Sequence, residues 1–123
     1  MSRSPTNQQV MSKTILLVED DESLRYLLTI VLSGHDGVGE IIEAGDGTEA
    51  LEICRETAPD IVVIDGKMPK MAGNETGIAI REMHPDTHII KFSGLDGAAV
   101  WANEVISKGA GVEALESAVR ALL

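Results

Sequence analysis

Apolar and polar residues follow two different periods along this chain. Short apolar runs that suit β-strands occupy residues 14–18, 40–44, 60–65, 88–94 and 104–108. Between and after them, apolar residues recur every three or four positions, which predicts helices at residues 21–34, 46–59, 74–85 and 111–123. Because strands and helices alternate, the pattern predicts an α/β domain.

Two of the strand segments are apolar on both faces, namely residues 15–18 (ILLV) and 61–64 (IVVI). A strand needs this composition when helices cover both sides of a parallel sheet. We therefore expect a three-layer domain in which right-handed crossovers join five strands. Its ligand site should lie at the carboxyl ends of those strands.

Local signals support these boundaries in the second helix. Asp46 or Gly47 can open it, and the helix should end by Ala58, ahead of Pro59. Cys54 falls on its apolar face, so we interpret this residue as a small buried hydrophobe rather than a reactive thiol.

Length and composition restrict the classes of function. The 123 residues suit one domain at 13–123, preceded by a disordered tail at 1–12. A net charge of −10 disfavours binding to nucleic acid. No apolar run approaches the roughly 20 residues that membrane insertion needs. A single cysteine and no secretory signal lead us to expect a cytoplasmic protein.

Polar side chains follow the predicted strands at the points where the strands end. They are Glu19, Asp20, Asp21, Asp65, Ser93 and Lys108. Carboxylates from neighbouring strands repel each other and raise each other's pKa values unless a cation joins them. The pattern therefore predicts a divalent metal site built from Glu19, Asp20 and Asp65.

Oxygen donors of this kind suit Mg²⁺, which keeps several waters and needs only one or two direct carboxylates; Mn²⁺ could substitute for it. Beside such an ion, the Asp65 carboxylate can attack a phosphoryl group and become an acyl phosphate. The Lys108 ammonium and the Ser93 hydroxyl could then hold the phosphoryl oxygens.

Four segments resemble the receiver domains of two-component response regulators. They are VEDDESLR (18–25), DIVVIDGKMPKMAG (60–73), FSG (92–94) and SKG (107–109). The resemblance extends over residues 13–123 and implies a flavodoxin-like sheet with strand order 2-1-3-4-5.

The resemblance also implies roles for the residues at the strand ends. In that family the acidic pair after the first strand binds Mg²⁺, and the aspartate before x-x-Met-Pro is phosphorylated. The residue two positions after that aspartate gives its backbone carbonyl to the metal. These roles fall on Glu19 with Asp20, on Asp65 and on Lys67.

The family's hydroxyl and lysine that sense the phosphoryl group correspond, by the same resemblance, to Ser93 and Lys108. A receiver is a signalling domain rather than an enzyme. The implied phosphodonor is a sensor histidine kinase or a phosphotransfer protein, and the implied output is a downstream protein target. Because the sequence stops at Leu123, directly after the last predicted helix, we expect a stand-alone receiver.

Four features depart from the family's pattern. Glu19 replaces a common aspartate, and Lys108-Gly109 replaces the usual Lys-Pro, so we expect a trans peptide bond there. Val105 replaces the aromatic residue that rotates inward on activation. Only 14 residues separate Ser93 from Lys108, about two helical turns fewer than usual, so the fourth helix should be short or rearranged.

Without an aromatic residue to rotate, phosphorylation should act on the backbone of two glycine-bearing loops, 93–97 and 108–111. Trp101 lies between them, and we expect it mainly to fill the space left by the shortened helix.

Other polar residues have a simpler interpretation. We expect Asp21 to cap the first helix. Arg25 and Arg81 fall on helical positions where a solvated face is the default. His84 and His88 are separated by a proline, so no second metal site is predicted.

Two alternative functions remain open. An eroded receiver could serve as a constitutive protein-interaction module, since Val105 and Gly109 replace switch residues, although the presence of Asp65 and Lys108 argues against it. A phosphatase of the haloacid dehalogenase type would need an aspartate at the position of Lys67.

Overall fold

The computed structural model describes residues 12–68, 71–94 and 99–123. The strands are β1 (Lys13–Val18), β2 (Val38–Ala44), β3 (Ile61–Ile64), β4 (His88–Ser93) and β5 (Glu104–Ser107). The helices are α2 (Glu22–Ser33), α3 (Gly47–Glu56), α4 (Gly73–Met83), α5 (Val112–Arg120) and the short 3₁₀ helix η1 (Lys108–Ala110). The predicted tail, apart from Ser12, and residues 95–97 of the first predicted loop lie outside the described residues.

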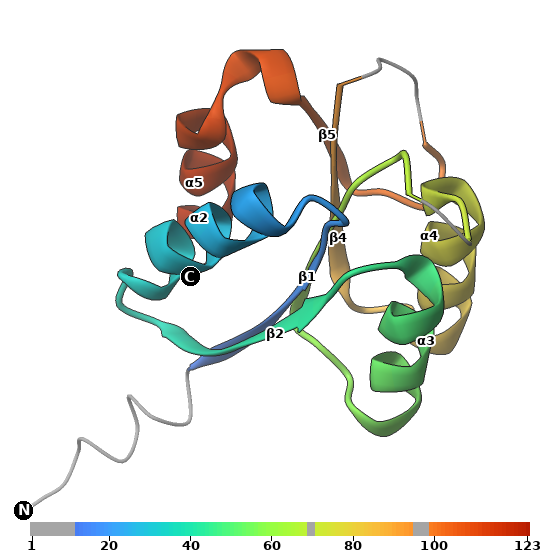
Figure 1. Ribbon diagram of the computed structural model, residues 1–123. Coiled ribbons are helices and arrows are strands. Elements are labelled where there is room, and N and C mark those ends of the chain that lie inside the picture. The colour runs from blue at the N-terminus through green and yellow to red at the C-terminus, as the bar shows by residue number, and fades with distance from the viewer. Residues whose placement is uncertain (1–11, 69–70, 95–98) are drawn as a thin grey trace, which may run out of the picture.

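The five strands form one parallel sheet in the order β2-β1-β3-β4-β5, which confirms the predicted flavodoxin-like topology (Figure 1). Val18, the last residue of β1, is opposite Ile64, the last residue of β3. Ile64 is in turn opposite Lys91 of β4. The residues that follow β1 and β3 therefore meet at one edge of the sheet.

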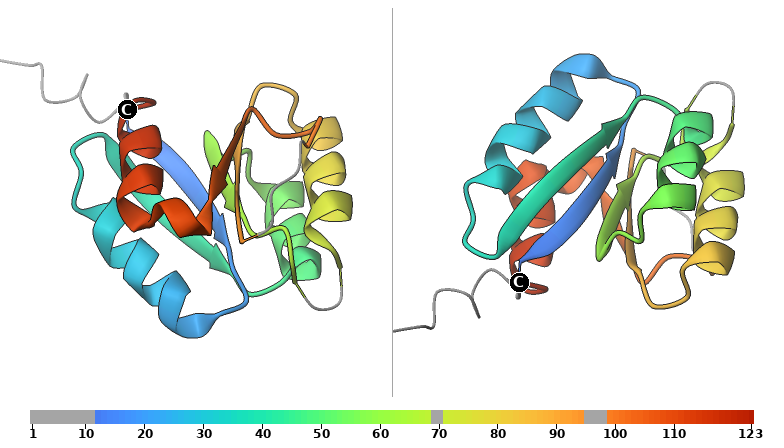
Figure 2. Two further views of the ribbon diagram at one scale, coloured as in Figure 1. Left: turned by 90° about the horizontal axis from the view of Figure 1, so that it is seen from above. Right: turned by 90° about the horizontal axis from the view of Figure 1, so that it is seen from below.

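Helices α2 and α5 cover one face of the sheet, and α3 and α4 cover the other (Figure 2). Alternate side chains of β1 enter the two cores, because successive residues of a strand point to opposite faces. Ile15 and Leu17 pack with α2 and α5, whereas Leu16 and Val18 pack on the side of α3 and α4. Among the described residues, none of the helices has the length and apolar character needed to cross a membrane.

The crossover from β4 to β5 departs most from a regular α/β unit. Its described residues, Gly94 and 99–103, form bends and turns. The fourth helix predicted from the sequence, which was expected to be short or rearranged, would belong to this crossover. Trp101 is buried, and its ring lies so close to Gly77 of α4 that a Cβ there would come within 2.2 Å of it. The indole Nε1–H donates to Oδ1 of Asn74 at 2.6 Å. Trp101 thus fills space beside α4, as expected.

Arg81 holds the same crossover in place, so the prediction that it is solvated is wrong. Its guanidinium donates to the Trp101 carbonyl at 3.0 and 3.1 Å and to Oδ1 of Asn103 at 2.6 Å. It also donates to the carbonyls of Pro85 and Thr87. One side chain thus satisfies backbone carbonyls both in the crossover and in the turn that precedes β4.

The local predictions for the helices hold. Asp21 caps α2 by accepting from the backbone N–H groups of Ser23 and Leu24, and Asp46 caps α3 by accepting from that of Glu49. Cys54 is 1% exposed. Burial raises the pKa of its thiol to about 11.

The two histidines contact different groups, as the intervening proline suggested. His84 Nε2 lies 2.6 Å from the Cys54 carbonyl oxygen, and His88 Nε2 lies 2.6 Å from Oε2 of Glu104.

Candidate functional site

Three carboxylates converge at the carboxyl edge of the sheet. Glu19 and Asp20 follow β1, and Asp65 follows β3, in the register that sets Val18 beside Ile64. One oxygen of each carboxylate lies within 4.8 Å of those of the other two. Glu19 and Asp65 are only 2% and 5% exposed, whereas Asp20 is exposed. The structure therefore brings together the three carboxylates that the sequence analysis selected.

Lys108 reaches this cluster from the end of β5. Its Nζ lies 3.1 Å from Oε1 of Glu19 and 3.3 Å from Oδ2 of Asp65. Burial opposes the charge of the ammonium, but the bonds to the two carboxylates outweigh it and raise the pKa of Lys108. Burial, together with the nearby charge of Asp65, raises the pKa of Glu19. Two buried acids thus share one cation.

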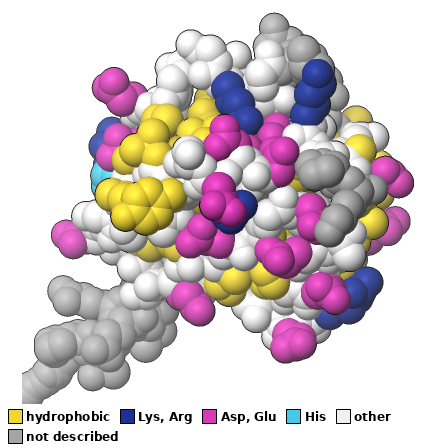
Figure 3. Space-filling view, in the orientation of Figure 1, with side chains coloured by type: hydrophobic (Ala, Val, Ile, Leu, Met, Phe, Trp, Pro, Cys, Tyr) yellow, Lys and Arg dark blue, Asp and Glu magenta, His cyan; other side chains and the backbone are white. Residues whose placement is uncertain are grey.

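Backbone groups hold the two buried carboxylates in place. The N–H of Asp21 donates to Oε2 of Glu19, and the N–H of Lys67 donates to Oδ1 of Asp65, both at 3.1 Å. Lys67 also lines an open pocket of about 450 Å³ beside the cluster. The other lining residues are Asp20, Gly66, Met68 and Ala72. Acidic side chains are widespread on the face shown in Figure 3, and fewer basic side chains are scattered among them.

Ser93 ends β4 next to the residue that follows Asp65. It is buried, and a Cβ built on Gly66 would lie 2.9 Å from its Oγ. The absence of a side chain at Gly66 lets the serine hydroxyl approach the backbone beside Asp65. Ser93 therefore lies at the carboxyl edge of the sheet, beside the residue that follows Asp65.

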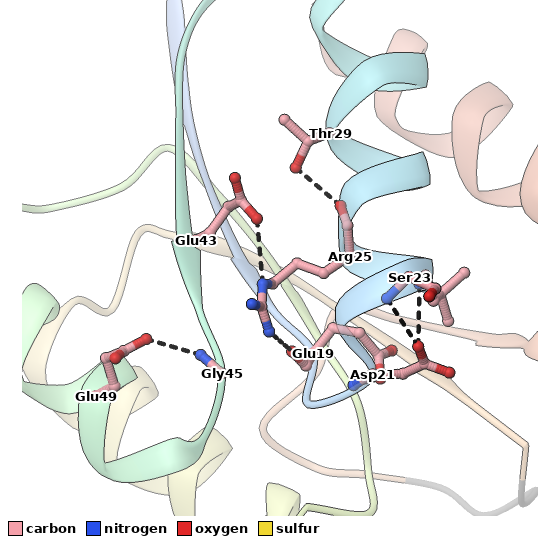
Figure 4. A network of polar contacts seen from close by, with 9 residues as sticks. Glu19, Asp21, Ser23, Arg25, Thr29, Glu43, Gly45 and Glu49 are labelled. Carbon is pink, nitrogen blue, oxygen red and sulfur yellow. Dashed lines mark hydrogen bonds and ion pairs between the residues drawn. The ribbon is translucent and has the colours of Figure 1, made fainter.

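Arg25 also contacts the site, although its helical position had suggested a solvated side chain. Its NH1 group donates to the backbone carbonyl of Glu19 at 2.7 Å, and its Nε pairs with Oε1 of Glu43 at 3.1 Å. Figure 4 shows the side chain extending from α2 across to β2. Arg25 thus fixes the backbone that carries the first metal-ligand candidate.

The donor set fits a hard divalent cation. Three carboxylates lie together, two of them buried, and Lys108 is the only cation within 4.0 Å of them in the described part of the chain. Mg²⁺ takes oxygen ligands and would neutralise the remaining negative charge. Glu19, Asp20 and Asp65 are the side chains that could hold it.

The structure also describes two of the features that depart from the receiver family's pattern, one in β5 and one directly after it. No cis peptide bond occurs in the described residues, so the bond between Lys108 and Gly109 is trans, as expected. Val105 is 42% exposed and lies on the edge strand.

The chain matches the model of the response regulator receiver domain family over residues 15–120 and belongs to that family. Receiver domains are signalling domains that accept a phosphoryl group, and they bind Mg²⁺ at their acidic site.

Individual relatives agree with this assignment. The response regulator GacA of Pseudomonas viridiflava is 30% identical over 117 residues, which cover 86% of this chain and 53% of the relative. The response regulator TrrA of Thermotoga maritima, solved in complex with Mg²⁺-BeF, superposes with a TM-score of 0.80 at 32% identity. That match covers 90% of this chain and 99% of TrrA.

The chemotaxis protein CheY4 of Vibrio cholerae has a TM-score of 0.77 at 26% identity, and the match covers 91% of this chain and 99% of that one. The chain spans about half the length of the GacA relatives.

Proposed function

We propose that Asp65 of this receiver accepts a phosphoryl group from a phosphohistidine of a sensor histidine kinase or a phosphotransfer protein. The observation that carries the proposal is the environment of Asp65. Its buried carboxylate lies within 4.8 Å of two further carboxylates and 3.3 Å from the Lys108 ammonium. With the Lys108 ammonium and a bound divalent cation beside it, such a carboxylate could act as a nucleophile and could also hold the acyl phosphate that forms.

The proposed metal ligands are Glu19, Asp20, Asp65 and the backbone carbonyl of Lys67. Mg²⁺ at this position would neutralise charge on the carboxylates and on phosphoryl oxygens. The Mg²⁺-BeF complex of the relative TrrA supports the assignment. Mn²⁺ shares the preference for oxygen ligands and should substitute for Mg²⁺.

The transfer itself needs little from the protein beyond position and charge. An Asp65 oxygen forms a bond to phosphorus while the bond from phosphorus to the histidine nitrogen breaks, and the nitrogen keeps the electron pair. Lys108 then exchanges a carboxylate contact for a phosphoryl oxygen, and Ser93 donates its hydroxyl to another. These new contacts would change the loops at the strand ends and signal to a protein partner.

Of the two alternatives, membership of the receiver family argues against the phosphatase of the haloacid dehalogenase type. A constitutive interaction module remains the second candidate, because Val105 and Gly109 stand where relatives carry switch residues. Such a module would keep the fold without accepting phosphate. We place the protein in the cytoplasm, where reducing conditions keep Cys54 as a thiol.

Incubation with acetyl phosphate and Mg²⁺, followed by intact mass measurement, tests the proposal. We expect one added phosphoryl group in the wild type, none in Asp65→Asn, and strongly reduced labelling in Asp20→Asn or with EDTA. Asp86→Asn is the matched control, since Asp86 is an exposed aspartate that lies before β4, at the opposite edge of the sheet, and its variant should label normally. Absence of labelling in folded wild-type protein would favour the interaction module.

A further inference from the structure

Lys91 occupies a position in the sheet where a charge is unexpected. Its neighbours in β4, Ile90 and Phe92, are 0% and 3% exposed. Helices cover both faces of this sheet, and a lysine in such a strand is costly unless its ammonium reaches water or a partner.

The register shows which way the side chain runs. Lys91 is opposite Ile64 of β3, yet its Cε lies beside Gly66, two residues nearer the carboxyl edge. A Cβ built on Gly66 would lie 2.8 Å from Lys91 Cε and 2.9 Å from Ser93 Oγ. Since a strand rises roughly 3.3 Å per residue, the side chain extends along the sheet toward its carboxyl edge, where Asp65 precedes Gly66.

Two features make room for this conformation. Gly66 has no side chain to block it, and the described residues of the crossover after β4 form no helix over this face. Val105, the β5 partner of Lys91, is 42% exposed on the same face. Within the described residues, no hydrogen bond or ion pair engages the Lys91 ammonium.

Lys91 and Lys108 approach the site from opposite faces. Ile64, the strand partner of Lys91, packs in the core beneath α3 and α4. Lys108 instead begins the segment that leads into α5, on the other face. Lys108 is already paired with Glu19 and Asp65, whereas Lys91 is available for a new anion.

We propose that Lys91 is a second phosphoryl-binding cation, which pairs with the group carried by Asp65 from the face opposite Lys108. The inference rests on the proposed function, because the anion it binds is the phosphoryl group of Asp65. The phosphoryl group carries up to about two negative charges, and because it replaces the single charge of the Asp65 carboxylate, the site becomes about one charge more negative in a chain of net charge −10. A second ammonium lowers the electrostatic cost of that addition.

The test uses beryllofluoride, an acyl phosphate mimic, at saturating Mg²⁺, and Mg²⁺ alone as the second ligand. Lys91→Met keeps the length of the side chain and removes its charge. We expect beryllofluoride to bind roughly three- to tenfold more weakly, while Mg²⁺ alone binds equally well or more tightly. Lys91→Arg should retain most of the wild-type affinity. Lys13→Met, at the amino end of β1, is the matched control and should change neither constant.

This difference between the two ligands separates an electrostatic role from structural damage, which would weaken the binding of both. The loss in Lys91→Met should also shrink at high ionic strength, since salt screens a partly exposed charge. Equal beryllofluoride affinity in Lys91→Met and wild type would overturn the inference while leaving the proposed function intact, as would parallel weakening of both ligands. Failure of the wild type to bind beryllofluoride would instead count against the proposed function.

Discussion

The Lys108 ammonium lies 3.1 Å from Oε1 of Glu19, a glutamate that is 2% exposed. The same ammonium contacts Asp65, so one lysine compensates two buried acids. Oε2 of Glu19 meanwhile accepts the N–H of Asp21. The Glu19 carboxylate thus makes both contacts, one through each of its oxygens.

Replacement of Lys108 by Met should destabilise the metal-free protein. It leaves Glu19 and Asp65 buried without their cation, and we expect the free energy of unfolding to fall by about 1–3 kcal/mol, since the lysine is partly exposed. Urea unfolding in EDTA measures this loss, with Lys13→Met as the control. Added Mg²⁺ should stabilise the variant more than the wild type. Unchanged stability in EDTA would contradict the coupling of the three side chains.

Gly77→Ala should strain the contact between α4 and the β4–β5 crossover. The new Cβ would come within 2.2 Å of the Trp101 ring, and we expect a loss of about 1–3 kcal/mol from overpacking. Trp101 fluorescence should shift toward that of a more exposed indole. Gly94→Ala is the control, because a Cβ there meets nothing within 4 Å. A fully stable Gly77→Ala protein with unchanged fluorescence would mean that the packing of Trp101 does not hold the crossover.

Cys54 should react slowly while the protein is folded. Its pKa is raised to about 11 by burial, so at pH 8 the native thiol carries far less thiolate than an exposed cysteine with a pKa of about 8.5. We expect its reaction with an aromatic disulfide reagent to be more than about a hundredfold slower than in denaturant. Rapid modification of the native protein would show that α3 opens readily.

Binding of a phosphoryl mimic should change the segment after β5 rather than helix α3. Lys108 begins η1 and would exchange a carboxylate for a phosphoryl oxygen, so amide exchange at 108–111 should slow when beryllofluoride and Mg²⁺ bind. Exchange in α3 should stay nearly unchanged. If binding is saturated and amide exchange at 108–111 is unchanged, this segment does not respond to the phosphoryl group.

Features that depend on short segments could be predicted from the sequence. Asp21 was predicted to cap the first helix, and Asp46 or Gly47 to open the second, because a cap is decided within a few residues. The meeting of Glu19, Asp20 and Asp65 was predictable because parallel strands with right-handed crossovers place their carboxyl ends at one edge.

Features that depend on distant packing could not be predicted. Arg25 and Arg81 were expected to be solvated, since helical spacing does not reveal which strand or loop lies opposite a helix face. The role of Lys91 could not be predicted from its place in an apolar run. The direction of its side chain depends on the register with β3 and on the space at Gly66. Such contacts join segments far apart in the chain.

The position of the phosphoryl group is the most direct test of Asp65 as the phosphoryl acceptor. Borohydride reduces an aspartyl phosphate to homoserine, so protein treated with acetyl phosphate and Mg²⁺ can be reduced, digested and sequenced by tandem mass spectrometry. We predict homoserine at position 65 alone, and none in protein treated without Mg²⁺. Homoserine at position 20 or 21 with Asp65 unmodified would contradict the account.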